Sequence, residues 1–307
     1  MEFIYYKILY LELPMSNVYY GRMARAKIRP GKIRIGFIGA GRLGTAFAFH
    51  CARLGYGIAG VYDINPECVR RLGRLLGRDF KGKGIKDLAR DSDVLFLTVP
   101  DKAIRPVFKM VREYLAPATV VVHCAGAFGI EVFDQEEALA LHPIQTFLNP
   151  KQAIAALPKG YFALEGTEKG LGFGKRLVRQ LKGRAIVIKG KDRPLYHSMC
   201  VFASNFINGL FAGAEEIGKK LGLSPSQTVK LLFPLAMATL QNIRENGAVL
   251  SLTGPVKRGD KITVRRHLQA LKERLPGLVP IYWELTRYLT KKSKERQGNE
   301  QKAPPVP

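Results

Sequence analysis

Cysteine and tryptophan are scarce in this chain, with four cysteines and one tryptophan in 307 residues. The cysteines are far apart and include no Cys-x-x-Cys pair, which argues against a disulfide framework or a zinc knuckle; they are Cys51, Cys68, Cys124 and Cys200. We therefore expect a reducing, cytoplasmic compartment. His, Cys, Asp and Glu form no cluster with metal-ligand spacing, and no Gly-x-Ser-x-Gly elbow or paired-carboxylate motif occurs. Metal and hydrolase chemistry are not expected.

Long hydrophobic runs are also missing. The apolar stretch from Phe3 to Leu13 is interrupted by Lys7 and Glu12 and lacks a small-residue cleavage site, so it predicts neither a signal peptide nor a spanning helix. We interpret residues 1–30 as an extension before the first strand and expect no membrane association.

Acidic residues are outnumbered, 25 against 49 basic ones, for a net charge of +24. The two ends contribute +3 each, so +18 remains between them. The positive electrostatic field of such a chain favours the binding of polyanions, which include dinucleotides, acidic substrates and nucleic acids. A generally basic, solvated surface explains the charge equally well. No aromatic-basic platform or nucleic-acid motif appears, so we do not expect a nucleic-acid partner.

Short β-branched runs alternate with helical segments over the first two thirds of the chain. This order is typical of a doubly wound sheet with helices on both faces. Long helical patterns without strand character then follow, in which Ser224 and Gln227 predict a capping box, Gly247 a helix end and Asp260 a helix cap. The sequence thus predicts an α/β fold, a doubly wound Rossmann domain followed by an all-α C-terminal domain, with four segments: an extension (1–30), the Rossmann domain (31–190), a helical substrate or dimerisation domain (191–290) and a disordered tail (291–307).

A glycine-rich turn follows the first strand and opens the first helix. It has the Gly-x-Gly-x-x-Gly pattern and consists of Gly39, Ala40, Gly41, Arg42, Leu43 and Gly44. In this context the glycines allow a tight turn, close approach of a pyrophosphate and close helix packing, while the helix N-terminus attracts the anion. Asp63, at the end of the second strand, suits the ribose hydroxyls and disfavours a 2′-phosphate. We predict NAD or NADP, with NAD favoured, although Arg70 and Arg71 could accommodate the phosphate.

Two further residues are expected near the cofactor. Val99 and Pro100 end a buried strand at the carboxyl edge of the sheet, where the nicotinamide half should lie. Pro100 has an alternative role as a simple strand terminator.

With these motifs the chain resembles the Rossmann-like oxidoreductases that carry the helical domain of unknown function 2520, distant relatives of ketopantoate reductase, pyrroline-5-carboxylate reductase and prephenate dehydrogenase. The resemblance covers roughly Ile33 to Leu289. It rests on the segments Gly36–Gly44, Thr98–Asp101, His123–Ala127, His142–Phe147, Ala203–Asn205 and Leu252–Asp260. Ala125 and Thr146 depart from the pattern, which has serine at both positions. The resemblance implies architecture more directly than chemistry.

Four residues are predicted to act on the substrate. His142 precedes a proline in a loop expected over the carboxyl edge, and a His-Pro pair contacts substrate in enzymes similar to prephenate dehydrogenase. On a helix from about Arg193 to Leu221, His197 and Asn205 belong to a polar stripe that suggests the wall of a cleft; in the distant relatives, lysine or asparagine on this helix polarises the substrate. Arg258, expected in a loop, could hold a carboxylate. Buried structural polar groups are the alternative.

Together these features predict an oxidoreductase that transfers hydride between a nicotinamide cofactor and a small anionic carbonyl, hydroxy or imine compound. The alternative is a nonenzymatic dinucleotide sensor or scaffold that dimerises through its helical domain. A deazaflavin remains a possible cofactor because related Rossmann domains use one. We expect a homodimer in either case.

Overall fold

The fold is described by a computed structural model that covers residues 33–80, 83–133 and 137–300. The expected extension at residues 1–30 therefore lies outside the described residues. Two compact units divide the chain between Val201 and Phe202. This boundary lies beyond residue 190, where the sequence suggested a domain limit, because the first turns of the helix that follows pack on the sheet unit through the buried side chains of Arg193 and Tyr196.

The first unit contains one sheet with the strand order β2-β1-β3-β4-β5-β6-β7. Neighbouring strands are parallel from β2 through β5, β5 and β6 are antiparallel, and β6 and β7 are again parallel. The strands are β1 (Arg34–Ile38), β2 (Gly57–Tyr62), β3 (Val94–Leu97), β4 (Val120–His123), β5 (Ala138–Pro143), β6 (Tyr161–Gly166) and β7 (Arg184–Val187); the helices are α1 (Arg42–Arg53), α2 (Pro66–Leu76), α3 (Ile85–Asp91), α4 (Asp101–Val111), α5 (Pro150–Ala156), α6 (Glu168–Gln180) and α7 (Arg193–Ala203).

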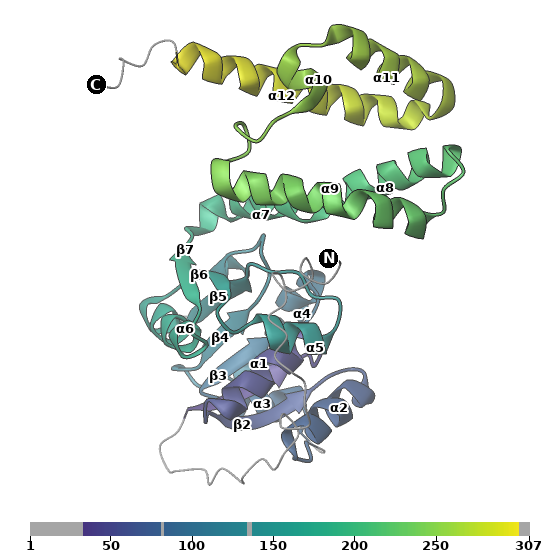
Figure 1. The fold of residues 1–307 in the computed structure, drawn as a ribbon. Helices are drawn as coiled ribbons and strands as arrows, with labels where there is room; N and C mark the ends of the chain where they lie inside the picture. The colour runs from purple at the N-terminus through teal and green to yellow at the C-terminus, as the bar shows by residue number, and fades with distance from the viewer. Residues whose placement is uncertain (1–32, 81–82, 134–136, 301–307) are drawn as a thin grey trace. The chain divides into compact units, whose positions relative to one another are not determined.

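Helices cover both faces of the sheet, as Figure 1 shows. Successive residues of β3 point to opposite faces: Val94 and Phe96 pack in a cluster with α1, α2, α5 and α6, whereas Leu95 and Leu97 pack in a second cluster with α3 and α4. All four side chains are almost completely buried, as expected for a strand covered on both faces. The predicted doubly wound Rossmann fold is confirmed.

Strand β5 was not predicted. The sequence analysis placed His142 and Pro143 in a loop, but both belong to this strand, where His142 pairs with Ala163 of β6. The run from Ala138 to Leu141 is buried throughout. Its short apolar side chains fit between β4 and β6, and this cross-strand environment is not visible in the local sequence pattern. His142 is therefore held by the ladder with β6.

The second unit consists of helices. They are α8 (Asn205–Lys220), α9 (Pro225–Asn246), α10 (Gly254–Arg258), α11 (Lys261–Arg274) and α12 (Val279–Glu300). The predicted capping box is confirmed, since Ser224 and Gln227 each accept a backbone hydrogen bond from the other. Asp260 caps α11 as expected by accepting from the Thr263 N–H at 3.0 Å, and Gly247 ends α9 with φ 80°. None of the described helices has the length and apolar character needed to cross a membrane.

Three expectations about the helices were wrong. The single helix predicted from Arg193 to Leu221 is interrupted at Ser204, whose φ of −134° and ψ of −72° separate α7 from α8. The predicted loop that contains Arg258 is the short helix α10. The tail expected to be disordered from residue 291 is helical to Glu300, where Lys291 and Lys292 pair with Glu295 one turn later; residues 301–307 lie outside the described residues.

Candidate functional site

The glycine-rich turn joins β1 to α1, and each of its glycines has a different environment. Gly39 has φ +101°, and a Cβ atom there would lie 2.5 Å from the Thr98 carbonyl oxygen. A Cβ at Gly44 would collide with the Gly39 carbonyl. A Cβ at Gly41, by contrast, would meet nothing within 4 Å. Gly39 and Gly44 are therefore required by the fold itself, whereas Gly41 borders open space at the N-terminus of α1, as an anion site requires.

Asp63 holds this turn from the end of β2. One carboxylate oxygen accepts a hydrogen bond from the Ala40 N–H at 2.6 Å, and the other accepts from the Asn65 N–H at 2.8 Å. Arg71 donates to the Ala40 carbonyl at 3.2 Å. The acid predicted to contact a ribose thus lies beside the phosphate loop.

The other residues predicted for the cofactor lie around the same edge of the sheet. Arg42 donates to the Phe147 carbonyl at 2.7 Å, and Leu43 packs against the core of the unit. The backbone of Val99 approaches Gly39 closely, since the Val99 nitrogen would be 3.1 Å from a Cβ at that glycine. Pro100 is the N-cap residue of α4. The residues present therefore fit a dinucleotide, with the turn for its pyrophosphate and Asp63 for a ribose.

His142 and His197 form a histidine cluster at the carboxyl ends of β4 and β5. Their ring centroids are 5.8 Å apart and their planes are nearly perpendicular. Nδ1 of His142 shares a 2.6 Å hydrogen bond with the Tyr196 hydroxyl. Burial, aided by the neighbouring His197 and Arg193, lowers the pKa of His142 to about 4. The imidazole is therefore neutral near pH 7.

Gly126, in the turn that follows β4, lies against both rings. A Cβ at this position would lie 3.0 Å from Nε2 of His142 and 2.9 Å from Cε1 of His197, and would collide with Nδ1 of His197. That Nδ1 atom is buried and has no hydrogen-bond partner among the described residues. Both imidazoles therefore present nitrogen atoms to the Gly126 Cα and leave no room for a side chain at this position.

His123 has a structural environment. It is fully buried at the end of β4. Its Nε2 lies 3.0 Å from the Gly129 carbonyl, and its Nδ1 accepts from the Ala125 N–H at 3.2 Å. Burial lowers its pKa to about 4. Both ring nitrogens are used by the backbone, so His123 has a packing role at the strand end.

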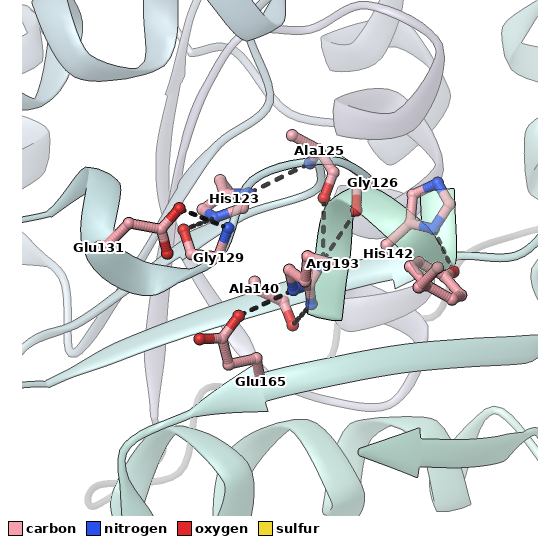
Figure 2. Close-up of polar contacts among 10 residues, drawn as sticks. His123, Ala125, Gly126, Gly129, Glu131, Ala140, His142, Glu165 and Arg193 are labelled. Carbon is pink, nitrogen blue, oxygen red and sulfur yellow. Dashed lines mark hydrogen bonds and ion pairs between the residues drawn. The ribbon is translucent and has the colours of Figure 1, made fainter. Parts of the chain in front are cut away.

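Arg193 and Tyr196 were missed by the sequence analysis. The Arg193 side chain is completely buried and pairs with Glu165 of β6 at 2.8 Å. Its remaining donors reach the carbonyls of Ala125 (3.2 Å), Gly126 (3.4 Å) and Ala140 (3.3 Å), as Figure 2 shows. One guanidinium thus joins the turn after β4, strand β5, strand β6 and the first turn of α7. Nothing in the local sequence distinguishes Arg193 from the many other basic residues.

Asn205 and Arg258 belong to the helical unit. Asn205 is exposed in the first turn of α8, and Arg258 is exposed at the end of α10. No hydrogen bond or ion pair joins either side chain to another described residue. Of the four predicted substrate residues, only His142 and His197 are in contact with each other. In the described part of the chain, no group of three or more His, Cys, Asp or Glu side chains could hold a metal ion.

Comparison with known families agrees with this two-part architecture. Residues 20–143 match a Rossmann-like domain, and residues 160–289 match the domain of unknown function 2520. The chain therefore combines the two modules that its motifs resembled. A curated relative, the glycerol-3-phosphate dehydrogenase [NAD(P)+] of Hydrogenovibrio crunogenus, is 30% identical over 146 residues, which are 43% of this chain and 42% of the relative. The match thus spans less than half of either protein.

Two solved structures are similar over almost their whole length. A protein from Thermotoga maritima, TM1727, is 27% identical with a TM-score of 0.69, and the match covers 86% of this chain and 99% of that one. A candidate NADP oxidoreductase from Bacteroides fragilis is 24% identical with a TM-score of 0.71, covering 85% of this chain and 98% of that one. These similarities establish the shared fold.

Proposed function

We propose that this chain, which joins a Rossmann-like domain to the domain of unknown function 2520, is an NAD(P)-dependent oxidoreductase. It acts on a small anionic carbonyl, hydroxy or imine compound. The observation that carries the proposal is the open space at Gly41, at the same sheet edge as His142 and His197, where the buried Nδ1 of His197 has no hydrogen-bond partner among the described residues. The names of the Hydrogenovibrio and Bacteroides proteins, a dehydrogenase and an NADP oxidoreductase, support the same chemistry. The free cysteines support a cytoplasmic location.

Each predicted substrate residue has a role in this proposal. The bound dinucleotide accepts or supplies the hydride, and the protein orients the reacting carbon and moves the proton. His142 and His197 contact the oxygen or nitrogen on that carbon. Asn205 supplies an amide hydrogen bond, and the guanidinium of Arg258 holds the anionic group of the substrate. The contact between the histidines supports their joint role, whereas Asn205 and Arg258 rest on their side-chain chemistry.

NAD is the favoured dinucleotide. Asp63 places a carboxylate beside the phosphate loop, with both oxygens held by backbone N–H groups. A 2′-phosphate on the adenosine ribose would meet this negative charge, whereas ribose hydroxyls can donate to it. Thermal unfolding at equal concentrations of NAD and NADP tests the preference: we expect the larger stabilisation with NAD, and Asp63→Asn should reduce the difference. Stronger stabilisation by NADP would reverse the assignment.

Gly41→Ala tests the cofactor site without disturbing the fold. Since a Cβ at Gly41 meets nothing within 4 Å, the variant should unfold at the wild-type temperature without ligand. It should lose most of the stabilisation by dinucleotide because the methyl group occupies the approach of the pyrophosphate. Gly41→Asp, which adds a negative charge, should abolish it. Gly172→Ala on α6, where a Cβ also meets nothing, is the matched control. Equal responses of wild type and both Gly41 variants would exclude this loop as the binding site.

Hydride transfer separates an enzyme from a sensor. The purified protein with NADH or NADPH is incubated with a panel of 2-oxo acids, imines and lactones, and loss of the reduced cofactor is followed by absorbance. We expect turnover with at least one anionic member. Binding without turnover across the panel would favour the dinucleotide sensor. Strongly salt-dependent association with DNA or RNA would instead indicate nucleic-acid binding.

We also propose that the chain forms a homodimer through its helical unit. Among the described residues from Phe202 onward, only Gly218, Thr228 and Ser293 are buried, and none of these is a large apolar residue. Large side chains such as Phe202, Leu231 and Leu235 are more than 60% exposed. Helices with so little buried apolar surface lack the main driving force for folding alone. A second copy provides matching apolar helices in a symmetric contact.

The oligomeric state tests this surface directly. Light scattering after gel filtration should give twice the chain mass for the wild type. Leu235→Glu on α9 should weaken the dimer because the interface would bury an unpaired charge. Lys230→Glu, a charge reversal at an exposed position of the same helix, should leave the dimer unchanged. A monomeric wild type would contradict the proposal.

A further inference from the structure

The Tyr196 hydroxyl lies on one side of the histidine cluster, 2.6 Å from Nδ1 of His142. Burial, aided by the Cys200 thiol one turn further along α7, raises the pKa of Tyr196. The tyrosine ring is almost completely buried. A phenol has only one proton to donate, so its direction determines the proton positions in the whole group.

The chemistry of the two neighbouring groups fixes this direction. A neutral imidazole nitrogen is a good hydrogen-bond acceptor, whereas a thiol sulfur is a weak one. Because 2.6 Å is short even for a hydroxyl donor, we assign the Tyr196 proton to the bond with His142 Nδ1. A neutral imidazole that accepts at Nδ1 carries its own proton on Nε2.

The opposite edge of His142 faces Gly126, where its Nε2 would lie 3.0 Å from a Cβ. Nδ1 of His197 approaches the same point more closely and is buried without a hydrogen-bond partner among the described residues. A buried polar atom without a partner is costly unless a ligand or water completes it. An N–H donor and an unpartnered acceptor nitrogen therefore lie close together beside Gly126.

We propose that Tyr196 is a positioning residue that holds His142 in the Nε2–H form. His142 then donates a hydrogen bond to the reacting oxygen of an alcohol or carbonyl substrate, while Nδ1 of His197 accepts or returns the proton of the substrate hydroxyl. The catalytic part of this inference rests on the proposed function. A hydroxyl group accepts one hydrogen bond and donates another, so it matches the pair in both directions. The proposal gives the two histidines different roles, hydrogen-bond donor for His142 and proton acceptor for His197, which the sequence alone could not distinguish.

The proton and electron balance is complete. In the oxidation direction, the substrate C–H bond breaks and its electron pair leaves as hydride, which the oxidised dinucleotide accepts. The O–H proton passes to Nδ1 of His197, which becomes an imidazolium, and the carbonyl oxygen keeps its hydrogen bond from His142. In reduction, the His197 imidazolium returns the proton to the oxygen, and the reduced dinucleotide supplies the hydride.

Nitrogen NMR of the cofactor-free, full-length protein at pH 7 tests the proton positions. In histidine-labelled protein, two-bond proton–nitrogen spectra distinguish protonated from unprotonated ring nitrogens, and His142→Gln and His197→Gln variants provide the assignments. We expect His142 to show a protonated Nε2 and an unprotonated Nδ1. Tyr196→Phe keeps the ring packing but removes the hydroxyl, so His142 should lose this single-tautomer signature and show averaged shifts of both nitrogens.

The helical unit offers a matched control. His267 Nδ1 lies 2.7 Å from the Tyr282 hydroxyl in a similar perpendicular arrangement, so Tyr282→Phe should alter the His267 signals and leave those of His142 unchanged. A wild-type His142 protonated at Nδ1, or one whose shifts do not respond to Tyr196→Phe, would overturn the inference. The wild-type spectrum decides the tautomer even if the Tyr196 variant fails to fold. Because no cofactor or turnover is involved, a failed oxidoreductase assay would be a separate result.

Discussion

Gly126→Ala should uncouple cofactor binding from catalysis. The φ angle of Gly126 lies outside the left-handed range, so the backbone accepts alanine; the consequence comes from the side chain. The new methyl group collides with Nδ1 of His197 and lies 2.9 Å and 3.0 Å from atoms of the two histidines. To reach the 3.4 Å at which ordinary contact begins, the His197 ring must retreat by about 1 Å. A displacement of this size lowers turnover by about 100-fold in well-organised active sites.

Turnover and thermal stabilisation should be measured side by side for this variant. With the substrate found in the hydride-transfer panel, we expect kcat to fall by about 100-fold, whereas the stabilisation by NAD should stay at the wild-type level because Gly41 and Asp63 are untouched. Gly172→Ala controls for the addition of a methyl group. Full turnover by Gly126→Ala would refute the placement of the reaction between the two imidazoles, and a parallel loss of NAD binding would show that the clash spreads through the unit.

Three further predictions concern stability in the absence of cofactor. Gly44→Ala should lower the free energy of unfolding by about 1–3 kcal/mol, because its Cβ collides with a backbone carbonyl that is fixed by the turn; thermal unfolding measures this. Arg193→Met leaves the Glu165 carboxylate without its partner and should cost about 3–5 kcal/mol in urea unfolding. Acid should destabilise the protein between about pH 6.5 and pH 4, because His123 and His142 have folded-state pKa values near 4 and the unfolded chain therefore binds more protons in this range. The free energy of unfolding should fall by up to about 1.4 kcal/mol per histidine for each pH unit.

These stability predictions have distinct controls. Gly41→Ala should not lower the unfolding temperature, in contrast to Gly44→Ala. Arg184→Met, at an exposed position of the edge strand β7, should cost far less than Arg193→Met. His142→Gln removes one of the titrating groups, so the free energy of unfolding should fall less steeply between pH 6.5 and pH 4. An unchanged slope in this variant would mean that the pKa of His142 in the folded protein is close to its value in the unfolded chain.

The placement of the glycine-rich turn beside Asp63 could be predicted because it is encoded locally. The turn from Gly39 to Gly44 contains its strand end, its glycines and its helix start within a few residues, and Asp63 follows at the next strand end. Such a unit has one stable geometry. The alternation of strands and helices then determined the sheet, and the caps at Ser224 and Asp260 were visible for the same local reason.

The substrate half depends on contacts between distant residues. Tyr196 and Arg193 reach His142, Glu165 and the turn at Gly126 only because β4, β5 and β6 are neighbours in the sheet. No local pattern shows these partners. The interruption at Ser204 was missed for a related reason: the residues on both sides favour helix, and helical periodicity continues across a break of one residue.

Burial, charge and hydrogen bonding all favour the same protonation state of His142. The Arg193 guanidinium is completely buried beside the cluster, and its positive charge, together with desolvation, opposes protonation and lowers the pKa of His142. In the proposed arrangement the Tyr196 proton occupies the Nδ1 lone pair of His142. An imidazolium would have to reverse that hydrogen bond and would add a charge next to Arg193. The neutral Nε2–H form satisfies all three constraints, so Arg193, which touches no predicted substrate residue through a hydrogen bond, still takes part in setting the proposed donor.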